Sequence, residues 1–402
     1  MRCLSGKKLL RGSLGMRVCS GWRQFLLFVT LIFFLSHFLS VLEWQKTTPS
    51  VKESHQKKQK FDHLVFGPAA GEGLPNRLQC KGMKALNKTH ISASSNMSNG
   101  GNGVTFVTVF AVYNSSADGR ASESTIVGKA SYNKVERSMT IMNTFINFIQ
   151  LMLPESNTII LTDPASRLPL KRNRVAVYPI QGDYSRDKLM LQRIRSYIAF
   201  LEEKLEERSR EPSQKITHYI FTDSDIAVVG DVGEIFSKYD NFHLALTFRN
   251  NKQQPLNSGF IAVRGTLDGM SRAKVFLEKV LEVYTTTYMK ASRMLGDQLA
   301  IASVIKSHAL FNAKAFSSHG SFLEDIDGAS VLFLPCEVYN WTPPEGAGQF
   351  HGMPLDVKVV HYKGSRKRLM LESWNFLNSS TSNDLSDMLC LVLSSGRTKY
   401  DF

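Results

Sequence analysis

In the larger part of the chain, short continuous apolar runs alternate with stretches whose apolar residues have helical spacing. The runs at 104–112, 158–161 and 174–179 predict buried strands, since β-branched and aromatic residues are frequent in them. The stretches at 134–153 and 186–207 repeat apolar residues three or four positions apart, which predicts helices. Strands joined by helices in this order indicate an α/β fold with a Rossmann-type, mostly parallel sheet flanked by helices.

The same alternation continues toward the carboxyl end. Further strands and helices are predicted at 218–222, 242–248, 257–264, 272–289 and from 296 onward. One domain, 104–378, accounts for all of these elements, and 379–402 remains as a carboxyl-terminal tail. A domain of this length can bury a sizeable core.

An almost unbroken apolar run lies near the amino terminus, at 25–42. Its 18 residues approach the thickness of a bilayer, and the segment before it, 1–24, carries six basic and no acidic side chains. We therefore predict a transmembrane signal anchor of type II, with a cytosolic tail at 1–24 and the rest of the chain in a lumen. A cleaved signal peptide is the alternative, but no small-residue cleavage site follows the run.

Residues 43–103 predict a flexible stem, because they are rich in Lys, Gln, Ser, Asn and Gly and show no sustained apolar period. Patterns for N-glycosylation occur in the stem and beyond it, and Pro343 disfavours the use of one of them. Those that we expect to carry sugar are at Asn87, Asn96 and Asn378, and two others match at Asn114 and Asn340.

Three of the five cysteines, Cys80, Cys336 and Cys390, would lie in the lumen, and an odd number allows at most one disulfide within a monomer. Cys336 with Cys390 is the candidate pair within one chain, whereas Cys80 could join two chains in a homodimer. The sequence leaves these alternatives open. No Cys or His spacing suggests zinc.

The net charge of +14 does not indicate a nucleic-acid partner. Six basic residues lie in the predicted cytosolic tail and others in the stem, and no basic repeat interleaved with aromatic residues occurs in the domain. A mildly basic surface remains, which would favour an anionic ligand.

The strand predicted at 218–222 ends in Asp223-Ser224-Asp225, at the sheet edge where an open α/β fold builds its site. Carboxylates one residue apart leave a strand end on opposite sides, so one can face a divalent cation while the other holds a ribose or a water. Mn²⁺ and Mg²⁺ prefer oxygen ligands and bind together with substrate phosphates. The alternative is a pair that only caps a turn, since short motifs have false matches.

Three further motifs follow in the order Asn257-Ser258-Gly259, Gly296-Asp297-Gln298 and His361-Tyr362-Lys363-Gly364. Together with the Asp-x-Asp strand, their order and spacing resemble GT-A-fold nucleotide-sugar glycosyltransferases, in particular the retaining families 8 and 77. The resemblance covers about 270 residues. Each motif is weak alone, and the four in sequence are more specific.

The resemblance implies metal ligands at Asp223, Asp225 and His361, with Asp223 also placed to contact the ribose or a metal-bound water. It implies catalytic or sugar-binding roles for Asp297 and Gln298 beside the anomeric carbon. The residues that would contact the rest of the nucleotide sugar are Asn257, Ser258, Gly259, Lys363, Gly364, Lys188 and Arg195. Structural alternatives are a core histidine at 361, a helix cap at Asp297 and solvated helix charges at Lys188 and Arg195.

The implied activity is that of a Mn²⁺- or Mg²⁺-dependent hexosyl- or pentosyltransferase in the Golgi membrane. It would pass a sugar from a nucleoside-diphosphate donor to a glycan or glycoprotein acceptor, with retention of configuration. Inversion would need a carboxylate base, for which Asp325 and Asp327 are candidates by location. The segment after His361 lacks the Gly-x-x-Lys-Pro-Trp ending common in family 8, so retention stays open.

Two rivals belong to other classes. A haloacid-dehalogenase-like phosphatase also has Asp-x-Asp after a strand, but it requires Thr or Val where this chain has Ala227, and it opens its domain with that strand. A lumenal scaffold that binds a sugar or nucleotide without turnover would keep the same fold. Metal-dependent hydrolysis of a nucleotide sugar separates the enzyme from the scaffold.

Overall fold

The computed structural model describes residues 103–113, 125–127, 130–166, 168–249, 254–291, 295–308, 311–343, 356–371 and 374. All of them belong to the second of two compact units, His63–Phe402. Predictions for the signal anchor, nearly all of the stem, the carboxyl-terminal tail and the glycosylation sites at Asn87, Asn96 and Asn378 lie outside these residues. Within the described ranges, no helix combines the length and apolar character needed to cross a membrane.

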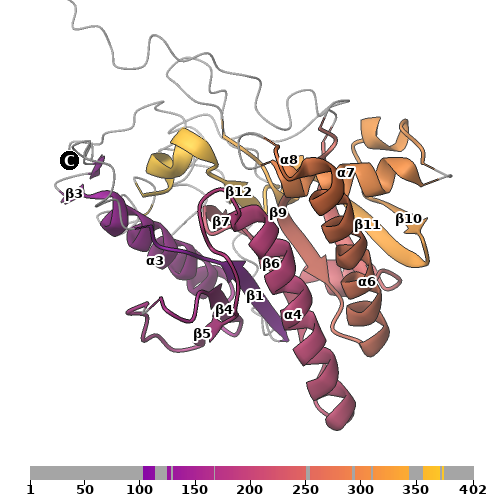
Figure 1. Ribbon diagram of the computed structural model, residues 1–402, viewed down its shortest axis with the longest axis horizontal. Coiled ribbons are helices and arrows are strands. Elements are labelled where there is room, and N and C mark those ends of the chain that lie inside the picture. The colour runs from indigo at the N-terminus through magenta and orange to yellow at the C-terminus, as the bar shows by residue number, and fades with distance from the viewer. Residues whose placement is uncertain are drawn as a thin grey trace, which may run out of the picture. The chain divides into compact units, whose positions relative to one another are not determined.

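An eight-stranded sheet with the order β10-β11-β8-β9-β6-β1-β4-β5 forms the centre of this unit (Figure 1). Its strands are β1 (Val104–Val109), β4 (Asn157–Thr162), β5 (Val175–Pro179), β6 (His218–Thr222), β8 (Leu244–Phe248), β9 (Leu256–Val263), β10 (Phe322–Ile326) and β11 (Ala329–Pro335). Strands β6, β1, β4 and β5 run parallel, as do β8 and β11. Strand β9 is antiparallel to both of its neighbours, and β10 is antiparallel to β11. The predicted α/β fold is therefore confirmed, with four parallel pairs among seven.

Helices cover both faces of the sheet. The longer ones are α3 (Lys134–Met152), α4 (Leu189–Arg210), α6 (Leu267–Val283) and α7 (Gly296–Ser307), with short α5 (Glu234–Lys238) and α8 (Cys336–Tyr339). Successive side chains of a strand point to opposite faces, so Phe106 packs in the core beside α3 while Val107 packs in the core beside α4, α6 and α7. These two apolar cores hold the sheet rigid beneath its carboxyl edge.

The helix boundaries predicted from the sequence agree closely with the structure at α3 and less well at the other helices. A capping box starts α3: Asn133 Oδ1 accepts the Glu136 N–H at 2.9 Å, and Glu136 Oε2 accepts the Asn133 N–H at 2.8 Å. The helix predicted at 272–289 begins earlier, at Leu267, where Thr266 caps it. Its last turn is a π-helix, Tyr284–Tyr288, which the apolar spacing did not predict.

A second, two-stranded sheet delivers the carboxyl-terminal part of the domain to the end of β6. Strand β7 (Ile226–Val228) starts directly after Asp225 and pairs antiparallel with β12 (Val359–His361), so that His361 lies opposite Ile226. The Tyr362 N–H donates to the Asp225 carbonyl at 2.8 Å. This pairing brings residues far apart in sequence to the same edge as the Asp-x-Asp motif. The remaining described elements, β2 (Thr125–Val127), β3 (Ala130–Tyr132) and single 3₁₀ turns at Ala315–Ser317 and Gly364–Arg366, are short.

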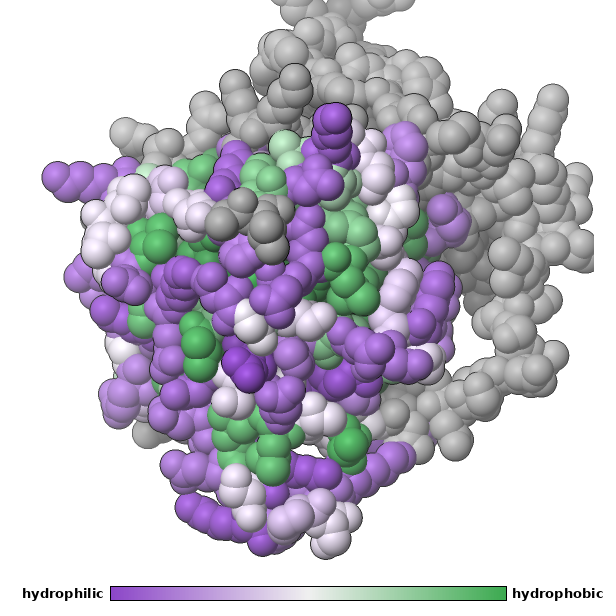
Figure 2. All heavy atoms as spheres, turned by 90° about the vertical axis from the view of Figure 1, so that its right-hand side faces the viewer, coloured by the Kyte–Doolittle hydropathy of each residue, from purple (hydrophilic) through white to green (hydrophobic). Residues whose placement is uncertain are grey.

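The surface shown in Figure 2 has small apolar groups separated by hydrophilic residues. The large hydrophobic side chains that are exposed on the described part of the molecule include Leu267, Val275 and Leu323. Scattered exposed apolar residues are normal for a solvated protein.

Candidate functional site

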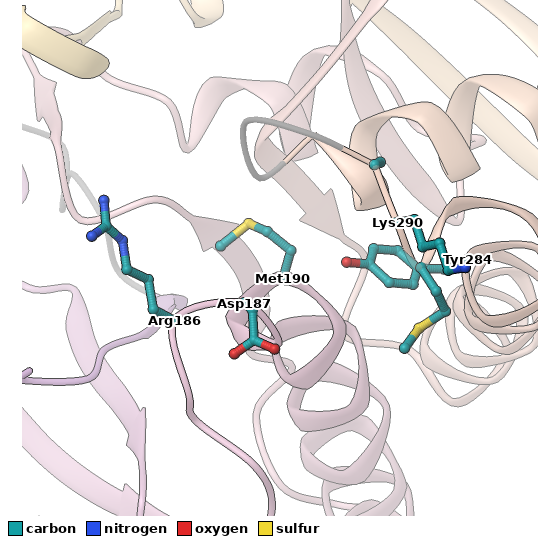
Figure 3. Close-up of a pocket in the computed structure, with 7 residues that line it drawn as sticks. Arg186, Asp187, Met190, Tyr284 and Lys290 are labelled. Atoms are coloured by element: carbon teal, nitrogen blue, oxygen red, sulfur yellow. The ribbon is translucent and has the colours of Figure 1, made fainter.

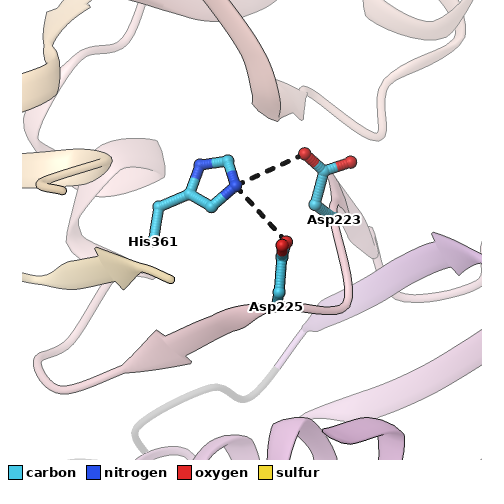
Figure 4. A group of neighbouring side chains, drawn as sticks. All are labelled: Asp223, Asp225 and His361. Carbon is cyan, nitrogen blue, oxygen red and sulfur yellow. Dashed lines mark ion pairs between the residues drawn. The ribbon is translucent and has the colours of Figure 1, made fainter. Parts of the chain in front are cut away.

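Asp223, Asp225 and His361 converge at the carboxyl end of β6 (Figure 4). His361 Nε2 lies 3.5 Å from Asp223 Oδ2 and 3.3 Å from Asp225 Oδ1. One ligand atom from each residue lies within 4.8 Å of the others. Two carboxylates and an imidazole in this arrangement form a set of donors that suits Mn²⁺. The structure thus brings together the three residues that the sequence proposed as metal ligands.

Hydrogen bonds to Asn257 and Asn340 determine which nitrogen of His361 faces the carboxylates. The backbone N–H of Gly259 donates to Asn257 Oδ1 at 2.8 Å, so that oxygen is an acceptor. The Asn340 Nδ2 group, 2.9 Å from the same oxygen, must therefore donate to it. This orientation turns Asn340 Oδ1 toward His361 Nδ1 at 2.8 Å, where it accepts the ring N–H. In the neutral imidazole, the Nε2 lone pair then points at Asp223 and Asp225, as a metal ligand requires.

Asn340 is a positioning residue that the sequence signalled only as a glycosylation pattern. Its side chain is 1% exposed, and its Nδ2 also donates to Thr247 Oγ1 at 3.0 Å. The amide is therefore fixed by three partners, of which His361 is one. The placement supports the sequence argument against sugar at this pattern.

Replacing Asn340 with Leu is expected to lower the affinity for Mn²⁺ about 10–100-fold, the usual effect of losing a partner that orients a ligating histidine. Titration of the free Mn²⁺ signal by electron paramagnetic resonance measures it. Thr247→Val, which removes a partner of Asn340 without touching His361, is the matched control. An unchanged Mn²⁺ affinity in a folded Asn340→Leu protein would show that the hydrogen bond does not serve the metal.

Arg193 from α4 is a central residue of the site, and sequence reasoning missed it. It is 5% exposed, and its guanidinium pairs with Asp223 and with Asp297 while donating to Ser258 Oγ at 2.8 Å. Burial is the largest single effect on the pKa of Arg193 and lowers it, but Asp223, Tyr197 and Asp225 together raise it above its ordinary value, so the charge is kept. Arg193 thereby ties the ends of β6, β9 and α7 into one cluster.

Lys188 and Arg195, the basic residues chosen from this region of the sequence, do not join the cluster. Both are exposed, and Lys188 pairs with Asp183 at 2.8 Å. Arg195 lies two positions after Arg193, on the opposite side of the helix. Arg193 lies among the buried residues of α4, whereas Arg195 is exposed, and this difference is visible only in the structure.

The other sugar-pocket residues of the prediction lie at the same edge. Asp297 does not cap α7 through its side chain, because that carboxylate pairs with Arg193. Gln298 is buried and donates to Gln254 Oε1 at 3.3 Å. A Cβ on Gly259 would lie 2.6 Å from His361 Cε1 and 2.8 Å from Asp223 Oδ2. Glycine at 259 therefore leaves room for the metal ligands.

Basic side chains of the carboxyl-terminal segment surround the carboxylates. Lys367 Nζ lies 3.1 Å from Asp225 Oδ2. Burial, together with the charges of Arg249 and Arg366, lowers the pKa of Lys363 to about 8. Burial raises the pKa of Asp225, but His361 and Lys367 together lower that pKa by a larger amount. The pKa of Asp225 therefore lies below its usual value. Cations held close to one another in this way create a positive potential that suits a diphosphate. Gly364, also predicted here, has φ +68° and opens the turn that carries Arg366.

The structure removes Asp325 and Asp327 from the list of candidate bases. They lie at the hairpin turn between β10 and β11, and the start of β11 pairs with the start of β8. Since β8 runs in the same direction as β6, this turn is at the amino edge of the sheet, opposite the metal ligands. Asp327 pairs there with Lys279.

Cys336, at the start of α8, is buried and unpaired in the structure, and burial raises the pKa of its thiol to about 12. Such a thiol is unreactive at neutral pH. Cys80 and Cys390, its candidate partners in the sequence, lie outside the described residues. The disulfide therefore stays a prediction.

No protein-family model and no curated protein matches the chain. Among solved structures, the fold is similar to the "Crystal structure of a glycosyltransferase involved in the glycosylation of the major capsid of PBCV-1". The two share 12% sequence identity over 66% of this chain and 98% of that one, with a TM-score of 0.35. A similarity of this size carries no conclusion about activity, so the function has to come from the site itself.

Proposed function

We propose that this protein is a metal-dependent glycosyltransferase that moves a sugar from a nucleoside-diphosphate donor to a glycan or glycoprotein acceptor. The observation that carries the proposal is the convergence of Asp223, Asp225 and the oriented His361 at the sheet edge. The cations beside them, Lys363 and Lys367, match the other half of such a ligand, a diphosphate.

The chemistry assigned to this site follows from charge. In the transfer, the acceptor hydroxyl oxygen bonds to the anomeric carbon while the bond from that carbon to the diphosphate breaks, and the bonding electrons leave with the diphosphate. A bound Mn²⁺ or Mg²⁺ would neutralise the charge that develops there. The Lys363 ammonium would stabilise the same oxygens, as a half-buried cation beside the ligand cluster.

Arg193 and Asp297 would act at the sugar. Arg193 holds the Asp297 carboxylate at the start of α7, next to Ser258. With one oxygen on the guanidinium, the carboxylate can present the other to a sugar hydroxyl. Held in this way, the pair would orient the anomeric carbon toward the acceptor.

Retention of configuration is part of the proposal. The two carboxylates weighed as bases lie at the far edge of the sheet, and Asp297 is neutralised by Arg193. In a retaining transfer the departing diphosphate takes the acceptor proton, so no separate carboxylate base is required. Type II topology, residence in the Golgi membrane and the choice of hexose or pentose remain predictions from the sequence.

The phosphatase alternative is disfavoured by one contact. A phosphatase of that type needs its first Asp as a free nucleophile, whereas the Asp223 carboxylate is paired with Arg193. The scaffold alternative keeps every contact described above and differs only in turnover.

The test is an assay of the full-length protein in detergent with a panel of uridine and guanosine diphosphate sugars, with Mn²⁺ or with a chelator. We expect Mn²⁺-dependent thermal stabilisation by one nucleotide and slow metal-dependent release of that nucleotide from one donor sugar. Stabilisation without any release identifies the scaffold. If no nucleotide stabilises the protein in Mn²⁺, the proposed function is wrong.

A further inference from the structure

A pocket of about 640 Å³ lies between the start of α4 and the π-helix that ends α6 (Figure 3). Arg186, Asp187 and Met190 form the wall on the α4 side, and Tyr284, with Met289 to Ala291, forms the other. None of these side chains belongs to the metal and diphosphate cluster. The pocket is therefore a second candidate site in the part of the chain that the structure describes.

Tyr284 connects this pocket to the proposed sugar site. A Cβ on Gly296 would lie 2.4–2.8 Å from the Tyr284 ring and hydroxyl, so the phenol rests directly on the backbone beside Asp297. The charge of Arg193 is close enough to lower the pKa of Tyr284, although burial has the larger effect and raises it. Met190 lies one helical turn before Arg193. The pocket thus opens next to the carboxylate and guanidinium that would hold the donor sugar.

The π-helix gives Tyr284 this position. It replaces the last turn of α6 over Tyr284–Tyr288, and single π turns inside α-helices occur frequently at functional sites. The Tyr284 side chain is 5% exposed, and its hydroxyl is directed toward Met190 across the pocket (Figure 3). Within the described ranges, no residue forms a hydrogen bond with that hydroxyl. A hydroxyl that lies at a pocket wall and has no protein partner there is available to a polar group of a ligand, as donor or as acceptor.

We infer that the pocket binds the acceptor as a hydroxyl-rich saccharide, with the Tyr284 hydroxyl bonded to one of its hydroxyl groups. This inference rests on the proposed function and adds the acceptor site to it. Met190 and Met289 would pack on the C–H faces of the sugar ring, as adaptable apolar side chains do. Asp187 offsets part of the charge of Arg186 and Lys290, which favours a saccharide rich in hydroxyls over a polyanion.

The experiment compares wild type with Tyr284→Phe, which keeps the ring against Gly296 and removes only the hydroxyl. Full-length protein with Mn²⁺ and uridine or guanosine diphosphate is applied to an array of defined oligosaccharides, neutral and uronate-containing. We expect binding to a group of neutral saccharides and a loss of affinity of about 2- to 10-fold in Tyr284→Phe, the size of one lost hydrogen bond. Tyr288→Phe, in the same π-helix but outside the pocket lining, is the matched control.

A second variant, Ala291→Trp, fills the pocket and should abolish saccharide binding while Mn²⁺-dependent nucleotide binding stays unchanged. Equal saccharide binding by wild type, Tyr284→Phe and Ala291→Trp would overturn the inference. So would binding of uronate-containing saccharides alone, or of no saccharide, by a protein that binds nucleotide. If the wild-type protein binds no nucleotide in the presence of Mn²⁺, the result would instead contradict the proposed function.

Discussion

Asp225→Asn is expected to abolish Mn²⁺-dependent nucleotide binding, with a fall in metal affinity of more than about 100-fold. The change keeps the shape of the side chain and removes the charge that faces both His361 Nε2 and Lys367 Nζ. An amide oxygen is a weaker ligand for Mn²⁺ than a carboxylate, and the amide would replace one carboxylate oxygen with an NH₂ group, which can neither bind the metal nor accept a hydrogen bond from Lys367. Transfer should fall to background because the departing diphosphate would lose its counter-charge.

Isothermal titration with Mn²⁺, followed by the nucleotide, measures the two losses separately. Asp240→Asn, an exposed carboxylate just before the start of β8, at the edge of the sheet opposite the ligand cluster, serves as the control and should bind as wild type does. Retention of Mn²⁺-dependent nucleotide binding by Asp225→Asn would mean that the cation is held elsewhere. The metal assignment for Asp223 and His361 would then also be withdrawn.

Arg193→Met should both lower the free energy of unfolding and abolish sugar transfer. The substitution leaves Asp297, 2% exposed, without its buried partner, and it removes the guanidinium from Asp223 and Ser258. Removing one member of a buried ion pair typically costs about 3–5 kcal/mol. Transfer should be lost even below the melting temperature, because the Asp297 carboxylate is no longer held where the sugar is expected.

Chemical denaturation gives the change in the free energy of unfolding, and donor hydrolysis gives the change in activity. Arg195→Met is the matched control, because it lies on the same helix and is exposed. It should change stability by less than about 0.5 kcal/mol. A stable, active Arg193→Met protein would show that the cluster is dispensable, and Asp297 would lose its proposed role at the sugar.

The sequence predicted those parts of the fold and the site that depend on residues close together in the chain. Apolar runs such as 218–222 predicted strands because a buried strand must be apolar on both faces, and the Asp-x-Asp motif was visible because only one residue separates its two carboxylates. His361 was reached through the resemblance, and its place beside Asp225 depends on the pairing of β12 with β7. No local pattern encodes that pairing.

The residues that sequence reasoning missed depend on helix rotation and on distant contacts. Arg193 faces the site because α4 packs on the sheet with that side of the helix. Only this packing distinguishes Arg193 from Arg195. Asn340 acts through His361, Asn257 and Thr247, which come from different strands. The start of the π-helix was likewise hidden, since the apolar spacing of α6 continues smoothly into it.

The burial of Asn340 has a consequence for biosynthesis. Asn340-Trp341-Thr342 fits the acceptor pattern for N-glycosylation, and the nitrogen that would receive the oligosaccharide is the one that donates to Thr247 and Asn257. A newly made chain that entered the secretory pathway would have to escape modification here, either because Pro343 disfavours it or because the segment folds first. In a molecule that carried an oligosaccharide on Asn340, this side chain could not be buried with its hydrogen bonds to Thr247 and Asn257. N-glycosylation at Asn340 would therefore mark misfolded chains for quality control.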